Sequence, residues 1–416
     1  MYTNRPFGSK FVFEGNGIMA AAQEENPGEG VDVPRHSPPP AFRNPSKQLR
    51  EAFSSPRVSV VIVNHNGVDL LWSCLFALQT QTLKPFEIIL VDNASTDASV
   101  SFVKSNYPNI KVLECQENFG FAAAANLGAK FAEGNLIALL DNDAVPTPDW
   151  LFRLVVAFRM HLKDVGAVTS EVKPKKEEAK PGPRHDFRSF LGGAVEGFFR
   201  TPGEIFSPVR CAMLYSPVFL PEGPFDSDYF IYEEDVYLGW KLRLQGRKIY
   251  RSTEAKLFHE GGGTSGRLPK WKTDFYRVRN RWLNLLVFYE EQNLWKVFPC
   301  ILVEAAARWL WELLTDWRAW WGTTSAIGWF LAHPRAVYQK RQAVQKRRKI
   351  PDSEILSCQS GRVFQDGGIF STFLNLLSLS YCRLAGLRIA ESGWPENTAK
   401  TFRPLKEDLG KSPVQE

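Results

Sequence analysis

Two aspartates follow an apolar run near the middle of the chain. The run 136–140 reads Leu-Ile-Ala-Leu-Leu, and the next residues are Asp141, Asn142 and Asp143. Carboxylate oxygens suit Mg²⁺ or Mn²⁺, and these ions usually bind through one or two carboxylates plus the phosphates of a substrate. The triplet therefore indicates a site for a divalent metal and a diphosphate. Taken alone it also fits a plain strand end, because Asp-x-Asp occurs by chance in many chains.

A second acidic group and a histidine lie further along the chain. Glu233, Glu234 and Asp235 open a predicted helix. Acidic residues suit the dipole of a first helical turn, which explains one or two of them and leaves room for a catalytic carboxylate. His259 precedes the glycine-rich stretch 261–263, whose backbone N–H groups could wrap a diphosphate. A lone histidine is more often an ordinary polar residue than a metal ligand.

From Val58 onward, short apolar runs alternate with amphipathic segments. The predicted strands cover 58–63, 86–91, 110–113 and 136–140, and the predicted helices cover 69–81, 97–106, 121–133 and 148–161. Pro148 suits the first turn of the last of these helices. The alternation predicts an α/β fold with a mostly parallel central sheet and helices on both faces.

The predicted strand ends carry polar residues. Asn64, Asp92 and the Asp141 triplet all follow apolar strands, and ligands of such sheets bind beyond the carboxyl ends of the strands. Gly120 precedes an alanine-rich helix, whose N-terminus would favour phosphate while the glycine lets backbone approach a ligand. Tight packing of the helix on the sheet is an alternative explanation for the alanines.

Composition limits the remaining possibilities. The chain has 416 residues, a net charge of +6 and six cysteines without Cys-x-x-Cys spacing, which disfavours zinc and a disulfide framework. The Pro- and Gly-rich segment 1–56 is predicted to be disordered or loosely attached. The basic run 340–349 is either a solvated helix face or a surface attracted to anions. Without a secretory signal or a long uncharged stretch, we expect a cytoplasmic protein that does not cross the membrane.

Tryptophan is concentrated in the C-terminal part. Eight of the thirteen tryptophans lie between residues 282 and 329, in a region predicted to be helical. An apolar stripe at helical spacing comprises Val297, Phe298, Ile301, Leu302, Ala305, Ala306, Trp309, Leu310, Leu313, Leu314 and Trp317. Glu304, Arg308, Glu312 and Asp316 lie on the opposite face. The helix either lies in the plane of a membrane surface or packs on the core, and 369–381 is a second apolar stretch.

Several stretches resemble one enzyme family, in the family's order. They are 58–67, 91–97, 118–126, 140–144, 232–246 and 259–265. Together they resemble an inverting family 2 glycosyltransferase with a GT-A fold, in the rhamnosyltransferase-like branch. The expected organisation is a segment 1–56, a catalytic domain 57–290, an amphipathic helical, Trp-rich region 291–350 and an extension 351–416.

The resemblance implies a role for each matched residue. The implied catalytic residues are Asp235, as general base, and Glu234, and the implied metal ligands are Asp143, His259 and Asp141. Contacts with the nucleotide sugar are implied for Asn64, Asp92, Asn118, Gly120, Asn126, Asp141 and Asn142. Arg279, in a Tyr-x-x-Arg-Asn-Arg pattern, either contacts the diphosphate of the nucleotide sugar or the acceptor, or lies on a solvated helix face. Asp92 would read the imide of uracil or thymine, unless it only caps the next helix as Asp97 does. The chain departs from the family at Asn142, Tyr237 and Lys241, which puts the acceptor in doubt more than the reaction.

The resemblance also implies a cofactor and partners. The cofactor is Mn²⁺ or Mg²⁺, the donor is a dTDP- or UDP-sugar, and the acceptor is a glycan or a lipid-linked glycan. For such an acceptor we expect the protein to contact an anionic membrane peripherally, at the inner face of the cytoplasmic membrane. We expect no nucleic-acid partner, and the oligomeric state is open.

Two rival interpretations are weaker. A catalytically silent scaffold subunit would be expected to have lost some of the acidic residues, and the chain retains them. A dehydrogenase would carry Gly-x-Gly-x-x-Gly after the first strand, where this chain has Asn64-His65-Asn66-Gly67.

Overall fold

The computed structural model describes residues 55–174, 187–195, 203–259, 268–364 and 368–393. It also describes the backbone of two short strands, β1 (Phe11–Glu14) and β2 (Ile18–Ala21).

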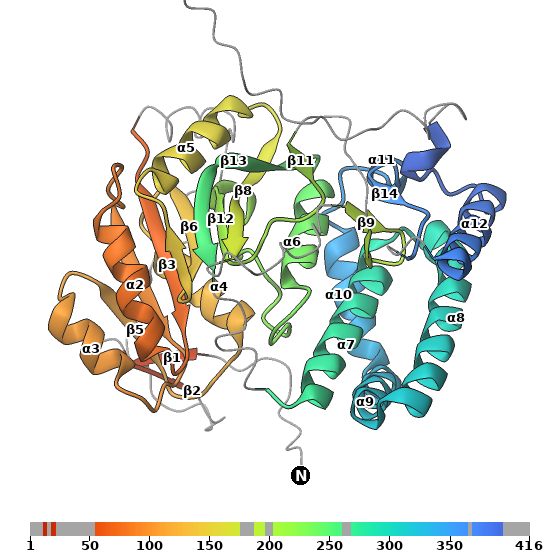
Figure 1. Ribbon diagram of the computed structural model, residues 1–416, viewed down its shortest axis with the longest axis horizontal. Coiled ribbons are helices and arrows are strands. Elements are labelled where there is room, and N and C mark those ends of the chain that lie inside the picture. Colours follow the sequence, from red (N-terminus) through yellow and green to blue (C-terminus); the bar gives the residue numbers. More distant parts are fainter. Residues whose placement is uncertain are drawn as a thin grey trace, which may run out of the picture.

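Within these residues a single large sheet organises the first half of the chain (Figure 1). Its strands are β3 (Val58–Asn64), β4 (Glu87–Asp92), β5 (Lys111–Cys115), β6 (Leu136–Asp141), β7 (Ala144–Pro146), β8 (Val165–Pro174), β11 (Glu204–Ile205), β12 (Ala212–Tyr215) and β13 (Lys248–His259). The order is β1-β2-β5-β4-β3-β6-β12-β8-β13-β11, and β7 pairs with β13. Strands β5, β4, β3 and β6 run parallel, as do β8 and β13, whereas β12 is antiparallel to both of its neighbours. The predicted mostly parallel α/β sheet is therefore confirmed.

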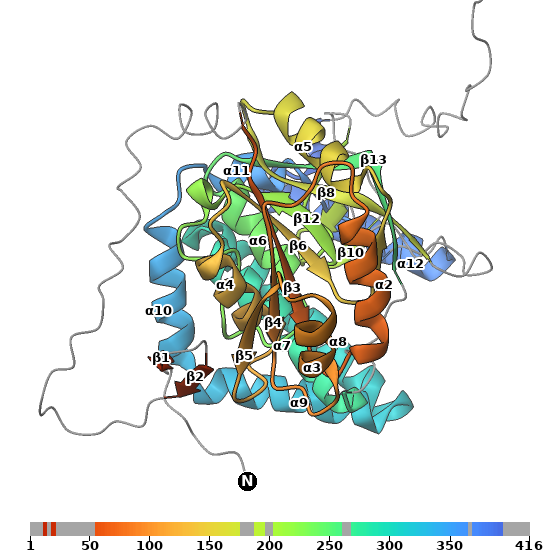
Figure 2. The same ribbon diagram turned by 90° about the vertical axis from the view of Figure 1, so that its left-hand side faces the viewer.

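Helices cover both faces of this sheet. They are α2 (Val68–Gln79), α3 (Ser99–Asn106), α4 (Phe121–Phe131) and α5 (Trp150–Met160), each within a few residues of its prediction. Figure 2 shows α4 on the side of the sheet opposite to α2. The parallel strands β3 and β6 are buried along nearly their whole length, as expected for strands covered on both faces. Pro148 lies just before α5 rather than inside its first turn.

The N-terminal segment differs in part from its prediction. Strands β1 and β2 pair with each other, and β2 pairs in parallel with the edge strand β5. Their apolar residues, such as Val12 and Ile18, favour extended structure even within a Pro- and Gly-rich segment. These two strands are paired rather than disordered, loose attachment of the segment stays a prediction, and the rest of 1–54 lies outside the described residues.

A helical region follows the sheet. Its helices are α6 (Glu234–Arg243), α7 (Lys270–Phe288), α8 (Glu291–Thr315), α9 (Trp317–Ala332), α10 (Pro334–Gln345), α11 (Asp352–Leu356) and α12 (Ile369–Leu384). Strands β9 (Phe187–Ser189), β10 (Ala194–Val195) and β14 (Gln359–Ser360) form a small second sheet. No helix in the described part of the chain is both long and apolar enough to span a bilayer.

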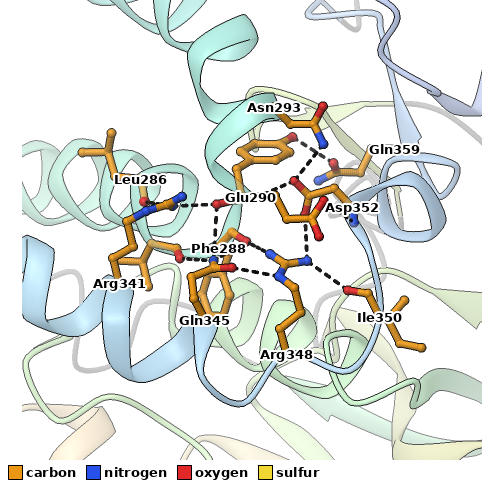
Figure 3. Close-up of polar contacts among 12 residues, drawn as sticks. Leu286, Phe288, Glu290, Asn293, Arg341, Gln345, Arg348, Ile350, Asp352 and Gln359 are labelled. Carbon is orange, nitrogen blue, oxygen red and sulfur yellow. Dashed lines mark hydrogen bonds and ion pairs between the residues drawn. The ribbon is translucent and has the colours of Figure 1, made fainter.

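Side chains of the basic run 340–349 connect α10 and α11 to the end of α7 by hydrogen bonds (Figure 3). Arg341 and Gln345 donate hydrogen bonds to carbonyls of residues 286–289 at the end of α7, and Arg348 donates to the Phe288 carbonyl and to Asp352. Cationic and amide donors satisfy the free carbonyls of a helix C-terminus and favour its dipole. Both predictions for the basic run, a solvated helix face and an anion-attracting surface, are therefore wrong for Arg341 and Arg348. The side chains of these residues join α10 and α11 to α7 instead.

Helix α8 turns its charged face inward. Glu304 accepts hydrogen bonds from Arg281 and Trp282 of α7 and from Arg308 of its own helix, and Arg308 also donates to the buried Glu312. Of the predicted apolar stripe, Val297 and Ile301 are buried, whereas Leu302, Leu310, Leu313, Leu314 and Trp317 are exposed. Packing of the apolar stripe on the core is therefore confirmed only for its first turns.

Candidate active site

Three predicted metal ligands meet at the carboxyl end of β6. Strand β6 ends at Asp141, and β7 pairs antiparallel with the end of β13, which aligns Ala144 with His259. The register places His259 Nε2 2.9 Å from Asp143 Oδ1 and 3.8 Å from Asp141 Oδ2. One ligand atom from each of the three residues lies within 4.8 Å of the others. The two aspartates are nearly buried, with 8% and 7% of their surface exposed.

The electrostatics of this cluster suit a cation. Burial alone would raise the pKa of Asp141, but Arg210 and His259 outweigh it and hold that pKa below its usual value. Burial would lower the pKa of His259, yet the two aspartates raise it to about 9. His259 Nε2 is buried between the carboxylates and makes no well-directed hydrogen bond within the described residues. A nitrogen and two carboxylate groups converging in this way fit a divalent metal.

Arg210 connects the metal cluster to the second acidic group. Its Nη2 lies 3.4 Å from Asp141 Oδ2, its Nη1 lies 3.1 Å from Glu234 Oε1, and its guanidinium sits 4.9 Å from the centre of the Phe121 ring. The two carboxylates raise the pKa of Arg210 further, against the effect of burial. The sequence alone does not indicate Arg210, because its position depends on the antiparallel placement of β12 beside β6, which brings Cys211 O to Asp141 N at 3.0 Å.

The start of α6 is a strained turn. Tyr232 and Glu233 have φ values of 68° and 65°, which side-chain-bearing residues rarely adopt. Asn280 of α7 donates to the carbonyls of Ile231 and Tyr232, and Asn284 donates to that of Glu233. Such strain persists only where neighbours enforce it, and it clusters at functional sites. The Tyr-x-x-Arg-Asn-Arg pattern contains Asn280, but the pattern does not predict that Asn280 holds this turn.

The three carboxylates of this turn differ in environment. Burial raises the pKa values of Glu233 and Glu234 to about 7, against the opposing effects of Arg188 and Arg210 respectively. The Asp235 side chain retains 26% exposure and lies 3.9 Å from Arg188 of β9. Glu234 is buried, whereas Glu233 and Asp235 are each partly exposed, and Asp235 lies in the first turn of α6. Arg188 had no signal in the sequence.

Asn64, Asp92 and Asn142 form one hydrogen-bonded chain across adjacent strand ends. Asn64 donates to Asp92 Oδ1 at 3.0 Å and accepts from Asn142 at 2.7 Å. Asp92 also accepts from the backbone and hydroxyl of Ser95. The structure thus brings these three predicted residues together. Asn142 links them to the metal cluster, because it lies between Asp141 and Asp143 in the sequence. Asp97, predicted to cap the next helix, accepts from the N–H of Ser99 in its first turn.

The loop before α4 is positioned by Asn93, which follows Asp92 at the end of β4. Asn93 donates to Asn118 Oδ1 and to the Gly120 carbonyl, and accepts from Phe119 N. Gly120 has φ of 83°, and a Cβ there would lie 2.4 Å from the Phe230 carbonyl oxygen. The close approach that requires glycine is therefore to the protein's own backbone at Phe230.

Two predicted nucleotide contacts have protein partners in the loop 225–228. Asn126 exchanges hydrogen bonds with the backbone of Phe225. Arg279 donates to the Asp228 carbonyl and packs against aromatic rings, including Trp329. Their contact with a nucleotide stays a prediction. The glycine-rich stretch 261–263 lies outside the described residues.

Comparisons with known proteins show to which family this chain belongs. The family model described as "Glycosyl transferase family 2" matches residues 59–220. The uncharacterized glycosyltransferase YwdF of Bacillus subtilis is 31% identical over 199 residues, which cover 47% of this chain and 69% of that protein. The chain belongs to glycosyl transferase family 2.

Other similar proteins match over different shares of their own length. The O-antigen biosynthesis protein RfbC of Myxococcus xanthus is 29% identical over 225 residues, and the match spans 49% of this chain but 17% of that protein. Among solved structures, S. aureus TarS 1–349 in complex with UDP-GlcNAc aligns with a TM-score of 0.48 and 17% identity, covering 80% of this chain and 88% of that one. The family domain thus contains Asp92, the Asp141 triplet and Arg210, whereas α6 and His259 lie beyond it.

Proposed function

We propose that this family 2 protein is a metal-dependent, inverting glycosyltransferase. It moves a sugar from a nucleoside-diphosphate donor to a hydroxyl group of a glycan or lipid-linked glycan. The observation that carries the proposal is the position of Arg210, which contacts both Asp141 and Glu234. The metal cluster, which would bind the diphosphate, and the acidic start of α6 are therefore neighbours. A displacement requires this arrangement, because the anomeric carbon must lie between the departing diphosphate and the base.

The donor half of the site comprises the metal cluster and the adjacent strand ends. Asp143, His259 and Asp141 would hold Mn²⁺ or Mg²⁺, which when bound neutralises charge on the departing diphosphate. Asp92, held by Asn64 and Ser95, would accept the imide N–H of the base. Asn118 and Gly120, at the N-terminus of α4, would face the phosphates.

The acceptor half is the start of α6. Asp235 takes the proton from the acceptor hydroxyl, while the hydroxyl oxygen forms a bond to the anomeric carbon. The bond from that carbon to the diphosphate oxygen breaks on the opposite face, so the configuration inverts. Glu234, buried against Arg210, positions the turn and does not need to reach the acceptor. A well-placed base supplies about 10²–10⁴-fold in rate.

The names of two relatives support a proposal about the partners. One is named as a poly(ribitol-phosphate) beta-glucosyltransferase and another as an O-antigen biosynthesis protein. For this chain we propose a similar polymer or its lipid-linked precursor as acceptor, and a dTDP-sugar such as dTDP-rhamnose, or a UDP-sugar, as donor. The alternative is a silent subunit that binds the nucleotide sugar without turnover.

A panel of nucleotide sugars tests the proposal. Each dTDP-, UDP- and GDP-sugar is added with Mn²⁺ and scored for a rise in melting temperature and for donor hydrolysis or transfer. We expect one donor class to raise the melting temperature only with metal and to turn over, giving a product of inverted anomeric configuration by NMR. Stabilisation without turnover would favour the silent subunit, and no metal-dependent stabilisation by any donor would contradict the proposal.

A further inference from the structure

The outward face of α8 is an uncharged surface. Between residues 295 and 314 the exposed residues of this helix include no charged side chain. They are Trp295, Pro299, Leu302, Val303, Ala306, Ala307, Leu310, Trp311, Leu313 and Leu314. Leu314 is 83% exposed and Val303 is 70% exposed. Contiguous apolar surface of this kind marks an interaction site rather than ordinary surface.

This orientation is fixed by the opposite face. Arg281 of α7 pairs with Glu304 at 2.6 Å, Arg308 pairs with Glu304 and Glu312, and the Trp282 indole N–H also donates to Glu304. The beginning of α8 is held as well, because Asp352 accepts hydrogen bonds from Glu290 N and from Asn293 (Figure 3). Rotating α8 to bury its leucines would break these ion pairs and would carry the buried Val297 and Ile301 away from the core.

Helix α12 extends the same surface. Its Tyr381 hydroxyl donates to the Lys296 carbonyl of α8 at 2.6 Å, and Figure 1 shows both helices on the side of the molecule away from α2 and α3. The large exposed apolar residues of α12 are Ile369, Phe370, Phe373, Leu376, Leu377 and Leu384. On α9, Trp317, Trp321 and Leu331 are exposed in addition. We call these exposed residues of α8, α9 and α12 the apolar face.

The charge on this face has one sign. Among the exposed residues of α9, α12 and positions 295–314 of α8, the charged side chains are Arg318 and Arg383, and no carboxylate is exposed. Such a combination suits the surface of an anionic bilayer. Trp side chains favour the boundary between headgroups and acyl chains, and the neighbouring cationic residues are attracted to the anionic headgroups. A protein partner would more often be met by a mixed polar rim.

We propose that the apolar face docks the protein onto an anionic lipid bilayer, with α8 and α12 lying in the plane of the interface. None of the described helices is suited to spanning it, so the contact is peripheral. The proposal does not depend on sugar transfer, since vesicle binding is measured without a donor.

Vesicle co-sedimentation of the full chain tests this proposal. The probes are phosphatidylcholine vesicles with and without phosphatidylglycerol. The double variant Leu310→Glu/Leu314→Glu should bind anionic vesicles at least about a hundredfold more weakly, because each leucine loses its burial. The matched control is Trp72→Glu/Met160→Glu, which alters two exposed apolar residues on α2 and α5 and should bind like the wild type.

Charge reversal separates lipid electrostatics from apolar burial. Arg318→Glu/Arg383→Glu should weaken binding by about fivefold or more per residue on anionic vesicles and little on neutral ones. Circular dichroism confirms that each variant is folded. Binding of the leucine variant within twofold of wild type, or an equal loss in the control, would overturn the proposal. So would a concentration-dependent dimer without vesicle binding, abolished by the leucine substitutions, because the face would then belong to a second copy.

Discussion

Charged side chains gather in two partly buried regions of this molecule, and their charge balance differs. Around α6 and the end of β6, the carboxylates of Asp141, Asp143, Glu233, Glu234 and Asp235 outnumber three cationic groups, the guanidinium groups of Arg188 and Arg210 and the imidazole of His259. Under α8, the two carboxylates of Glu304 and Glu312 face the two guanidinium groups of Arg281 and Arg308.

This difference in charge balance distinguishes a region that we expect to bind a ligand from a region that only stabilises the fold. A balanced set of ion pairs needs no further partner, and it fixes the orientation of α8. An excess of buried carboxylates is costly unless a cation compensates it or protonation neutralises it, as the raised pKa values of Glu233 and Glu234 reflect. We therefore expect a ligand to complete the site around α6 and the end of β6, whereas burial of charge by itself would not lead to that expectation.

The largest effect is expected at the proposed base. Asp235→Asn should lower kcat by about 10²–10⁴-fold, because the amide cannot take the acceptor proton. Donor binding, measured by thermal shift with Mn²⁺, should be retained. The matched control is Glu254→Gln, an exposed carboxylate on β13. Normal turnover in the Asp235 variant would remove the assignment of the base.

Arg210 is the connection between the two acidic groups. Arg210→Met should reduce kcat/KM by about 10–100-fold, as loss of a residue that orients metal ligands does. Without the guanidinium, Asp141 and Glu234 face each other uncompensated, so Arg210→Lys should recover part of the activity. A change of less than twofold in the methionine variant would show that the two groups act independently.

The balanced region predicts an unusual order of stability effects on α8. Glu304→Ala should lower the free energy of unfolding by about 1–3 kcal/mol, since it leaves Arg281 and Trp282 without their acceptor. Leu314→Ala, on the exposed face, should change it by less than about 0.5 kcal/mol. Urea unfolding measures both. A larger loss for leucine than for glutamate would mean that α8 packs with its apolar face inward.

The excess of carboxylates predicts a smaller, pH-dependent effect. The pKa of Glu233 is raised to about 7, so its contribution to stability is fully present below its unfolded pKa of about 4.5 and is lost as pH rises through about 7. Glu233→Gln removes this dependence. Between pH 5 and pH 8 the wild type should lose about 1–2 kcal/mol of unfolding free energy relative to the variant. Parallel curves for the two proteins would contradict the buried, ionisable state of Glu233.

Much of the donor half could be predicted from the sequence. Asp141, Asp143, Asp92 and Asn64 each follow an apolar strand, and parallel strands bring their carboxyl ends to one edge. His259 was matched by resemblance, and the pairing of β13 with β7 gives it a geometric reason.

The contacts that depend on antiparallel or distant pairing were not predictable. Arg210 reaches Asp141 through β12, Arg188 comes from a short strand in the second sheet, and Asn280 acts from α7. The inward face of α8 was also missed, because helical spacing shows that two faces exist and not which one meets the core. Gly120 illustrates the same limit, since the backbone that approaches it at Phe230 comes from a distant part of the chain.

Calorimetric titration of Mn²⁺ tests the central claim, that Asp143 and His259 share a divalent cation. The wild type and Glu254→Gln should bind the ion with equal affinity. Asp143→Ala and His259→Ala should each weaken that binding by at least about tenfold, because each removes one converging ligand. Wild-type Mn²⁺ affinity in either variant would contradict the claim.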